Sequence, residues 1–105
     1  MKIGFANKKI ERICNENKEA LKEFGNKKIA NNLAALMLNL RVTKHIEDFY
    51  TKPIFKKYRA HELIGDKKGI TSLSVDYAYR MTIIVTIQVV EDEITILEVN
   101  KHYED

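Results

Sequence analysis

The chain has 105 residues and a formal net charge of +3, with 45% hydrophobic and 31% charged residues. A chain of this length builds one hydrophobic core, so we expect a single domain over residues 1–105. The composition is that of a globular protein and argues against disorder. The longest apolar run, Ile83 to Val90, is too short to cross a membrane, and the first nine residues lack the apolar segment of a secretory signal. These features indicate a cytoplasmic protein that does not bind membranes.

Positive charge is concentrated in residues 1–81. Residues 1–40 carry eight Lys or Arg and four Glu, and residues 41–81 carry nine Lys or Arg and five acids, so each section has a surplus of +4. Residues 82–105 carry one lysine and six acids, which gives −5. A basic surface favours binding to a polyanion, because neutralised phosphates release their counterions. The same charge is also compatible with a solvated surface that has no partner.

The first half of the chain predicts two helices after a short strand that ends between Phe5 and Lys9. Apolar residues recur at helical spacing from Lys8 to Phe24, and Gly25-Asn26 ends that helix. A second helical stripe runs from Ile29 to Leu40. Because the gap between them is short, we expect an antiparallel helical hairpin. The first stripe consists of Ile10, Ile13, Cys14, Leu21 and Phe24.

The second half of the chain has the period of two that is typical of strands. Residues 44–57, with the only proline, are expected to form a connector with one helical turn at residues 45–50. Strands are predicted at residues 58–64, 72–79, 81–89 and 94–100. The last is apolar on both faces, which favours a position inside the sheet. The predicted fold class is α+β: a two-helix hairpin packed on a twisted, mainly antiparallel sheet of four to five strands.

The sequence contains no motif for a metal or for a nucleotide phosphate. The three histidines, His45, His61 and His102, lack the spacing of metal ligands. Two glycines, Gly65 and Gly69, lie in a predicted hairpin rather than between a strand and a helix. We therefore expect no cofactor.

Basic and aromatic residues on the predicted strands could support metal-free RNA cleavage. In that reaction the ribose 2′-hydroxyl is the nucleophile, and the protein moves two protons and stabilises the charged phosphorane. Histidine, lysine and tyrosine can carry the protons, arginine can bind the phosphate, and tyrosine can stack on a base. The candidates are Arg59, His61, Lys67, Lys68, Tyr79, Arg80, Lys101, His102 and Tyr103.

Each candidate also has a structural interpretation. Lys67 and Lys68 would solubilise a turn, and His61 would hydrogen-bond to its strand neighbours. Arg80 would pair with an acid on its own or a neighbouring strand, and residues 102–105 would form a frayed tail. The residues alone leave these alternatives open.

Four segments of the chain resemble the HigB branch of the RelE/ParE toxin superfamily. Proteins of that branch have an R-x-H-x-L-x-G-x-x-x-G hairpin, an aromatic–Arg pair at the start of the next strand, and a terminal strand that ends in a His/Tyr tail. The resemblance covers the whole chain in order, including the helical hairpin. The matching segments are Arg59–Gly69, Ser72–Val75, Tyr79–Met81 and Glu98–Tyr103.

The resemblance implies a RelE-like toxin of a type II toxin–antitoxin system. Such a toxin would cleave mRNA on the ribosome without a metal, and a HigA-like antitoxin with a helix-turn-helix would neutralise it. Arg80 would bind the scissile phosphate, and His102 and His61 would transfer protons. The expected catalytic residues are Arg80, His102, His61, Lys68 and Tyr103, and the expected RNA-binding residues are Arg59, Lys67, Tyr79 and Lys101.

Two positions depart from the HigB pattern. Ile64 stands where these toxins often have a lysine, and Lys101-His102-Tyr103 stands where they often end in Asp-Tyr-His. The alternative interpretation is a non-catalytic protein: a ParE-like toxin that acts on DNA gyrase, or a cleavage-deficient protein that binds only its antitoxin. A plain RNA-binding domain is a third interpretation.

Overall fold

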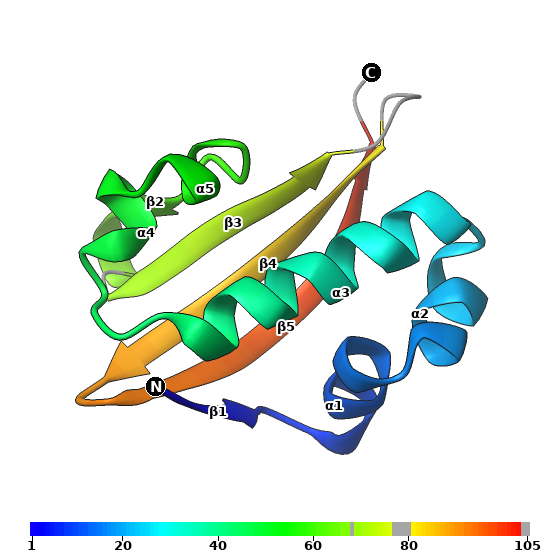
Figure 1. Ribbon diagram of the computed structural model, residues 1–105, viewed down its shortest axis with the longest axis horizontal. Coiled ribbons are helices and arrows are strands. Elements are labelled where there is room, and N and C mark those ends of the chain that lie inside the picture. Colours follow the sequence, from blue (N-terminus) through cyan, green and yellow to red (C-terminus); the bar gives the residue numbers. More distant parts are fainter. Residues whose placement is uncertain (68, 77–80, 104–105) are drawn as a thin grey trace.

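The computed structural model describes residues 1–67, 69–76 and 81–103 and has an α+β architecture (Figure 1). Its five-stranded sheet has the order β1-β5-β4-β3-β2, in which β1 is parallel to β5 and the other neighbours are antiparallel. The predicted fold class is confirmed, and β5 lies inside the sheet as its two apolar faces predicted. The strands are β1 (Lys2–Phe5), β2 (His61–Glu62), β3 (Ile70–Asp76), β4 (Met81–Val90) and β5 (Glu93–Tyr103). The helices are α1 (Lys8–Asn15), α2 (Asn17–Phe24), α3 (Lys27–Val42), α4 (Asp48–Thr51) and α5 (Pro53–Lys56), with a 3-10 turn, η1, at Gly65–Lys67.

Helix α3 supplies most of the helical side of the core. Asn26 caps its first turn, because the side chain accepts a hydrogen bond of 3.1 Å from the Ile29 backbone N–H. Its apolar stripe joins the inward side chains of β3, β4 and β5 in one buried cluster. The buried residues of α3 are Ile29, Ala30, Leu33, Leu36, Met37 and Leu40. Burial of this stripe fixes the helix against one face of the sheet.

The helix predicted from Lys8 to Phe24 is two helices, which corrects that prediction. The backbone is extended at Glu16, with φ −120° and ψ 108°. Asparagines, which disfavour helix interiors, flank this break. The side chain of Asn15 accepts a hydrogen bond from Arg41, and that of Asn17 donates one of 3.2 Å to Asn31. Both partners lie on α3, so α3 holds the break in place.

The change in helix phase alters which side chains are buried. Ala20 is buried in α2. Leu21, which the prediction of one continuous helix placed in the core, is 41% exposed. Cys14 lies in the core as predicted. Burial raises the pKa of its thiol to about 12, although the charge of Arg41 acts in the opposite direction. The thiol therefore stays protonated at neutral pH.

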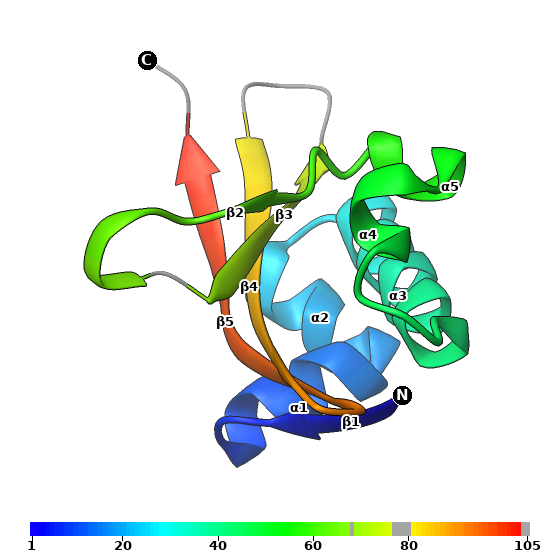
Figure 2. The ribbon, with the colours of Figure 1, turned by 90° about the vertical axis from the view of Figure 1, so that its left-hand side faces the viewer.

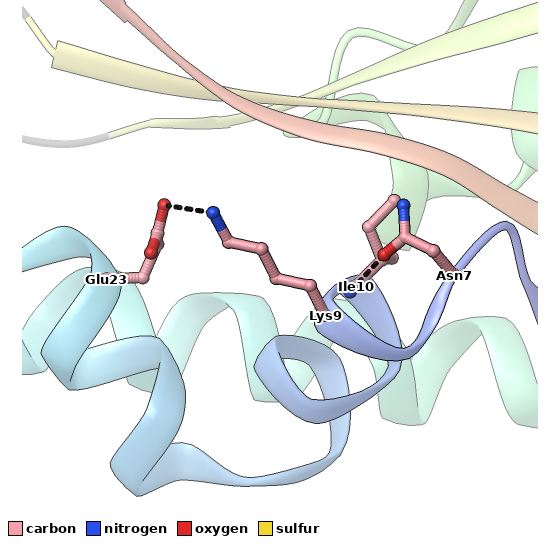
Figure 3. Close-up of polar contacts among 4 residues, drawn as sticks. All are labelled: Asn7, Lys9, Ile10 and Glu23. Carbon is pink, nitrogen blue, oxygen red and sulfur yellow. Dashed lines mark hydrogen bonds and ion pairs between the residues drawn. The ribbon is translucent and has the colours of Figure 1, made fainter.

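The first strand ends at Phe5, and helix α1 begins three residues later at Lys8. The Asn7 side chain accepts a hydrogen bond of 2.9 Å from the Ile10 backbone N–H and caps that helix (Figure 3). Lys9 and Glu23 form an ion pair at 3.7 Å that links α1 to α2. Both charged groups are exposed, so this pair contributes little to stability.

The strand predicted at residues 58–64 is much shorter, which corrects a second prediction. Tyr58 is buried in the core, and its backbone carbonyl accepts a hydrogen bond of 2.6 Å from Ser74 of β3. Arg59 then adopts a left-handed φ of 49°. This turn separates Tyr58 from β2, so only His61 and Glu62 join the ladder with β3.

The connector contains two short helices rather than one helical turn. Pro53 occupies the first turn of α5, where a missing N–H costs no hydrogen bond. Phe49 of α4 and Phe55 of α5 are buried and meet edge to face, with ring centroids 5.2 Å apart. The aromatic pair anchors this segment on the sheet beside α3 (Figure 1). The predicted strand at residues 72–79 is β3 as far as Asp76, and residues 77–79 lie outside the described residues.

The longest helix in the described ranges is α3, with 16 residues, and none of the helices there has the length and hydrophobicity that crossing a membrane requires.

Leu36 and Leu38 provide a matched test of this packing. Both lie on α3, but Leu36 is fully buried and Leu38 is 62% exposed. Leu36→Ala should lower the free energy of unfolding by about 2–5 kcal/mol, because it removes a core side chain and leaves a cavity. Leu38→Ala should change it by no more than about 0.5 kcal/mol. Urea unfolding followed by circular dichroism measures both, and equal effects would contradict the packing of α3.

Candidate functional site

The sheet has two unlike faces. Helices α3, α4 and α5 lie on one side of β3, β4 and β5, and the segment from β2 through η1 projects on the other side (Figure 2). Residues at paired positions of antiparallel strands point to the same face. The buried pairs Leu73–Val85 and Val75–Ile83 therefore point toward α3. We call the opposite surface of β3, β4 and β5 the open face; its described side chains include Ser72, Ser74, Thr82, Ile84, Thr86, Glu98, Asn100 and His102, and by the same pairing Ile70, Gln88 and Thr95.

A β-bulge decides which side chains of β5 reach the open face. Ile96 pairs with Ile87, but the next pair is Glu98 with Thr86, so Leu97 is an extra residue in β5. Before this residue, Ile94 and Ile96 are fully buried beneath the helices. After it the alternation is reversed, and Glu98, Asn100 and His102 lie on the open face. The bulge therefore brings His102 to the surface that the helices leave uncovered.

His102 lies on this face opposite a short hydroxyl side chain. It pairs with Thr82 of β4, which is 8% exposed, while His102 itself is exposed. One pair further along β5, the Asn100 amide donates a hydrogen bond of 2.7 Å to the Glu98 carboxylate. This geometry leaves the His102 ring accessible to a ligand on the open face.

His61 shares the open face but stands at the far side of the sheet. It pairs with Ser72 of β3, and its Nδ1 lies 3.0 Å from the Arg59 carbonyl oxygen. A carbonyl oxygen only accepts hydrogen bonds, so in the neutral ring Nδ1 carries the proton. Nε2 is then the basic nitrogen of His61.

The two histidines do not form a pair. Strands β3 and β4 lie between β2 and β5. His61 pairs with Ser72 of β3. His102 pairs with Thr82 of β4, whose own partner on β3 is Asp76, four residues from Ser72. Strand spacings of about 4.8 Å and residue rises of about 3.3 Å place the two backbones roughly 20 Å apart in a flat sheet. One scissile bond therefore cannot contact both rings.

Lys101, expected to bind RNA, lies on the helix side of the sheet. It pairs with the buried Ile83, and its Nζ lies 6.0 Å from the centre of the Phe24 ring of α2. The ammonium group therefore interacts with an aromatic face on α2 rather than with the open face. Arg59 is exposed next to β2.

The structure describes five of the expected site residues only in part or not at all. Lys68, Tyr79 and Arg80 are outside the described residues, and for Lys67 and Tyr103 only the backbone is described. Tyr103 pairs with Met81, the residue that follows Arg80 in the sequence. The roles given to these five residues remain predictions.

The hydroxyl and amide side chains of the open face were not among the sequence candidates. Ser72, Ser74 and Thr82 are all buried. Asn100 is two residues before His102 on β5 and points to the same face. Alternation within β3 and β4 could have identified the first three, because each alternates with core residues. Among the described residues, no three His, Cys, Asp or Glu side chains are grouped so that they could hold a metal ion.

Comparison with known proteins identifies the fold. Neither the family models nor the curated proteins contain a match to the chain. Among solved structures, a YoeB/ParE toxin from Agrobacterium tumefaciens matches with a TM-score of 0.56 at 13% identity, over 98% of this chain and 100% of that one. The conserved hypothetical protein HP0894 from Helicobacter pylori, solved in solution, matches with a TM-score of 0.51 at 19% identity, over 97% of this chain and 94% of that one. The chain therefore has the fold of these two proteins.

The neighbouring residues Lys101 and His102 test the two-faced sheet. Lys101→Ala removes the cation from the Phe24 ring and should lower the free energy of unfolding by about 0.5–1 kcal/mol. His102→Ala acts on an exposed position and should change it by less than about 0.5 kcal/mol. Chemical denaturation at pH 7 measures both variants. A larger loss for His102→Ala than for Lys101→Ala would contradict the assigned faces.

Proposed function

We propose that the protein is the toxin of a type II toxin–antitoxin system, in the HigB branch of the RelE/ParE superfamily. Its activity is ribosome-dependent cleavage of mRNA by a metal-free reaction that inhibits translation. The observation that carries the proposal is the open face, where His102 is exposed on a sheet surface that has hydroxyl and amide groups together with Ile84 and the Glu98 carboxylate. The fold shared with a YoeB/ParE toxin and the sequence resemblance to HigB toxins add support.

In this proposal the RNA lies across β3, β4 and β5. Nε2 or Nδ1 of His102 removes the proton of the ribose 2′-hydroxyl, and the oxygen attacks the adjacent phosphorus. The bond from phosphorus to the 5′-oxygen breaks, and Lys68 or Tyr103 protonates that oxygen. The products are a 2′,3′-cyclic phosphate and a 5′-hydroxyl. Arg80 offsets the negative charge that develops on the phosphorane oxygens.

His61 acts away from the scissile bond, because two strands separate it from His102. Together with Arg59 and Lys67 it contacts the RNA near β2, where the β2–η1 segment projects beyond the open face (Figure 2). Tyr79 stacks on an unpaired base. These contacts orient the chain without taking part in proton transfer.

The proposal includes a protein partner. A HigA-like antitoxin with a helix-turn-helix would neutralise the toxin in the cytoplasm. The protein acts on mRNA bound to the ribosome and needs no cofactor.

Arg80→Ala and His102→Ala should each relieve growth arrest on induction. Removal of a proton carrier typically costs 10²–10⁴-fold in rate, so cleavage should fall by about 10²-fold or more in His102→Ala. Primer extension on an induced reporter mRNA measures cleavage as new 5′ ends within translated codons. Lys18→Ala, an exposed substitution on α2, is the control and should cleave like the unmodified protein.

Primer extension, plasmid supercoiling and RNA binding together separate the alternative functions. New 5′ ends that persist in both Arg80→Ala and His102→Ala would contradict the site. Growth arrest without new 5′ ends, accompanied by altered plasmid supercoiling, would indicate a ParE-like action on gyrase. Salt-dependent RNA binding without toxicity would indicate a plain RNA-binding domain.

A further inference from the structure

The open face carries a negative charge where an anionic ligand would need cations. Glu98 is exposed on β5, and its carboxylate lies on this face. No lysine or arginine is among the described side chains that β3, β4 and β5 place there. A carboxylate repels a phosphate group at close range. A ligand that covers Glu98 therefore has to present hydrogen-bond donors to it rather than phosphate oxygens.

A neighbouring amide holds the Glu98 carboxylate in place. The Asn100 amide donates a hydrogen bond of 2.7 Å to Oε2 of Glu98, and both side chains are exposed. Within the described part of the chain this is the only hydrogen bond of the carboxylate, and it forms no ion pair there. Each carboxylate oxygen has two lone pairs. Both oxygens can therefore accept a further donor, side by side.

An apolar side chain lies between Glu98 and His102. Ile84 of β4 pairs with Asn100, the residue midway between these two on β5. Ile84 is half-buried on the face that the helices leave uncovered (Figure 2). Binding sites for single nucleobases commonly hold the flat ring against apolar or aromatic side chains. Ile84 thus offers a surface for a base whose edge faces the Glu98 carboxylate.

The four bases differ in what they present to a carboxylate. Guanine has two adjacent donors on its Watson–Crick edge, N1–H and the N2 amino group, which match the two oxygens of a carboxylate. Adenine and cytosine place one amino group beside an acceptor nitrogen, and uracil has one N–H between two carbonyl oxygens. A bidentate contact between a side chain and a base typically discriminates about 5- to 150-fold against the wrong base.

We propose that Glu98 selects guanine in single-stranded RNA that lies on the open face. N1–H and the N2 amino group of the base donate to the carboxylate, and the ring rests on Ile84. Glu98 stands four residues from His102 on β5, a distance of about 13 Å at a rise of about 3.3 Å per residue. The carboxylate therefore contacts a nucleotide beside the scissile bond rather than the bond itself.

The distance limits where the guanine lies in the substrate. A stacked strand rises about 3.4 Å per nucleotide, so the guanine lies within about four nucleotides of the scissile bond. That position rests on the proposed function, whereas the guanine contact itself does not.

Guanosine and inosine provide matched probes, because inosine lacks only the N2 amino group. Short oligouridine RNAs with one central guanosine, inosine or adenosine are made with 2′-O-methyl riboses, which cannot be cleaved through the 2′-oxygen. They are titrated into the isotope-labelled full-length protein, and the Asn100 side-chain amide signals report binding by NMR. The guanosine RNA should bind at least about fivefold more tightly than the adenosine RNA, with the inosine RNA between them.

Glu98→Gln tests the residue, because it keeps the shape of the side chain and replaces one acceptor oxygen with a donor NH2. It should abolish the preference for guanosine, since an amide pairs with adenine by accepting from N6–H and donating to N1. Glu11→Gln removes the same charge at an exposed position of α1 and should keep the preference.

Three outcomes of the titration would overturn the proposal. The first is equal affinity of the unmodified protein for the three RNAs, and the second is a guanosine preference that survives Glu98→Gln. The third is an equal gain in affinity for all three RNAs in Glu98→Gln, because the carboxylate would then act only by repelling phosphates.

Primer extension separates guanine selection from the proposed function. The unmodified protein should produce 5′ ends with guanosine enriched at one fixed position within about four nucleotides, and Glu98→Gln should remove that enrichment. New 5′ ends without an enriched guanosine would overturn guanine selection and leave the nuclease standing. Absence of new 5′ ends would contradict the proposed function, and the titration would then decide guanine selection alone.

Discussion

The register between β4 and β5 is the constraint on which the candidate site depends. Every side chain of β5 points either toward the helices or toward the open face, and it points to the same face as its paired residue on β4. The extra residue Leu97 reverses the alternation of the two faces halfway along the strand. Before the bulge the strand contributes Ile94 and Ile96 to the core, and after it the strand contributes His102 to the open face. The same short segment thus serves both stability and the candidate chemistry.

The regular elements could be predicted from the sequence because their burial is periodic. The apolar stripe of α3 and the alternation of apolar and polar residues in β4 indicate directly which side chains contact the core. The break at Glu16 could not be predicted in this way, because it depends on hydrogen bonds with residues of α3 that are distant in sequence: Asn15 accepts one from Arg41, and Asn17 donates one to Asn31. The shortness of β2 likewise depends on Tyr58 packing into the core before the chain turns.

The candidate site was predictable in part for the same reason. Residue types favoured a set of basic and aromatic side chains, but they carry no information on the face to which each one points. His102 and Lys101 are neighbours, yet one lies on the open face and the other over the Phe24 ring. Their placement depends on the bulge at Leu97, which an apolar run in the sequence does not reveal. The separation of His61 from His102 depends on strand order, which is a property of the whole sheet.

The most direct measurement is the set of cross-strand nuclear Overhauser contacts between β4 and β5 in solution. We expect backbone contacts between Ile87 and Ile96, between Thr86 and Glu98, and between Thr82 and His102, with Leu97 left unpaired. We also expect contacts between the side chains of Lys101 and Phe24. A continuous register that pairs Leu97 with Thr86 would turn His102 toward the helices and contradict the proposed site.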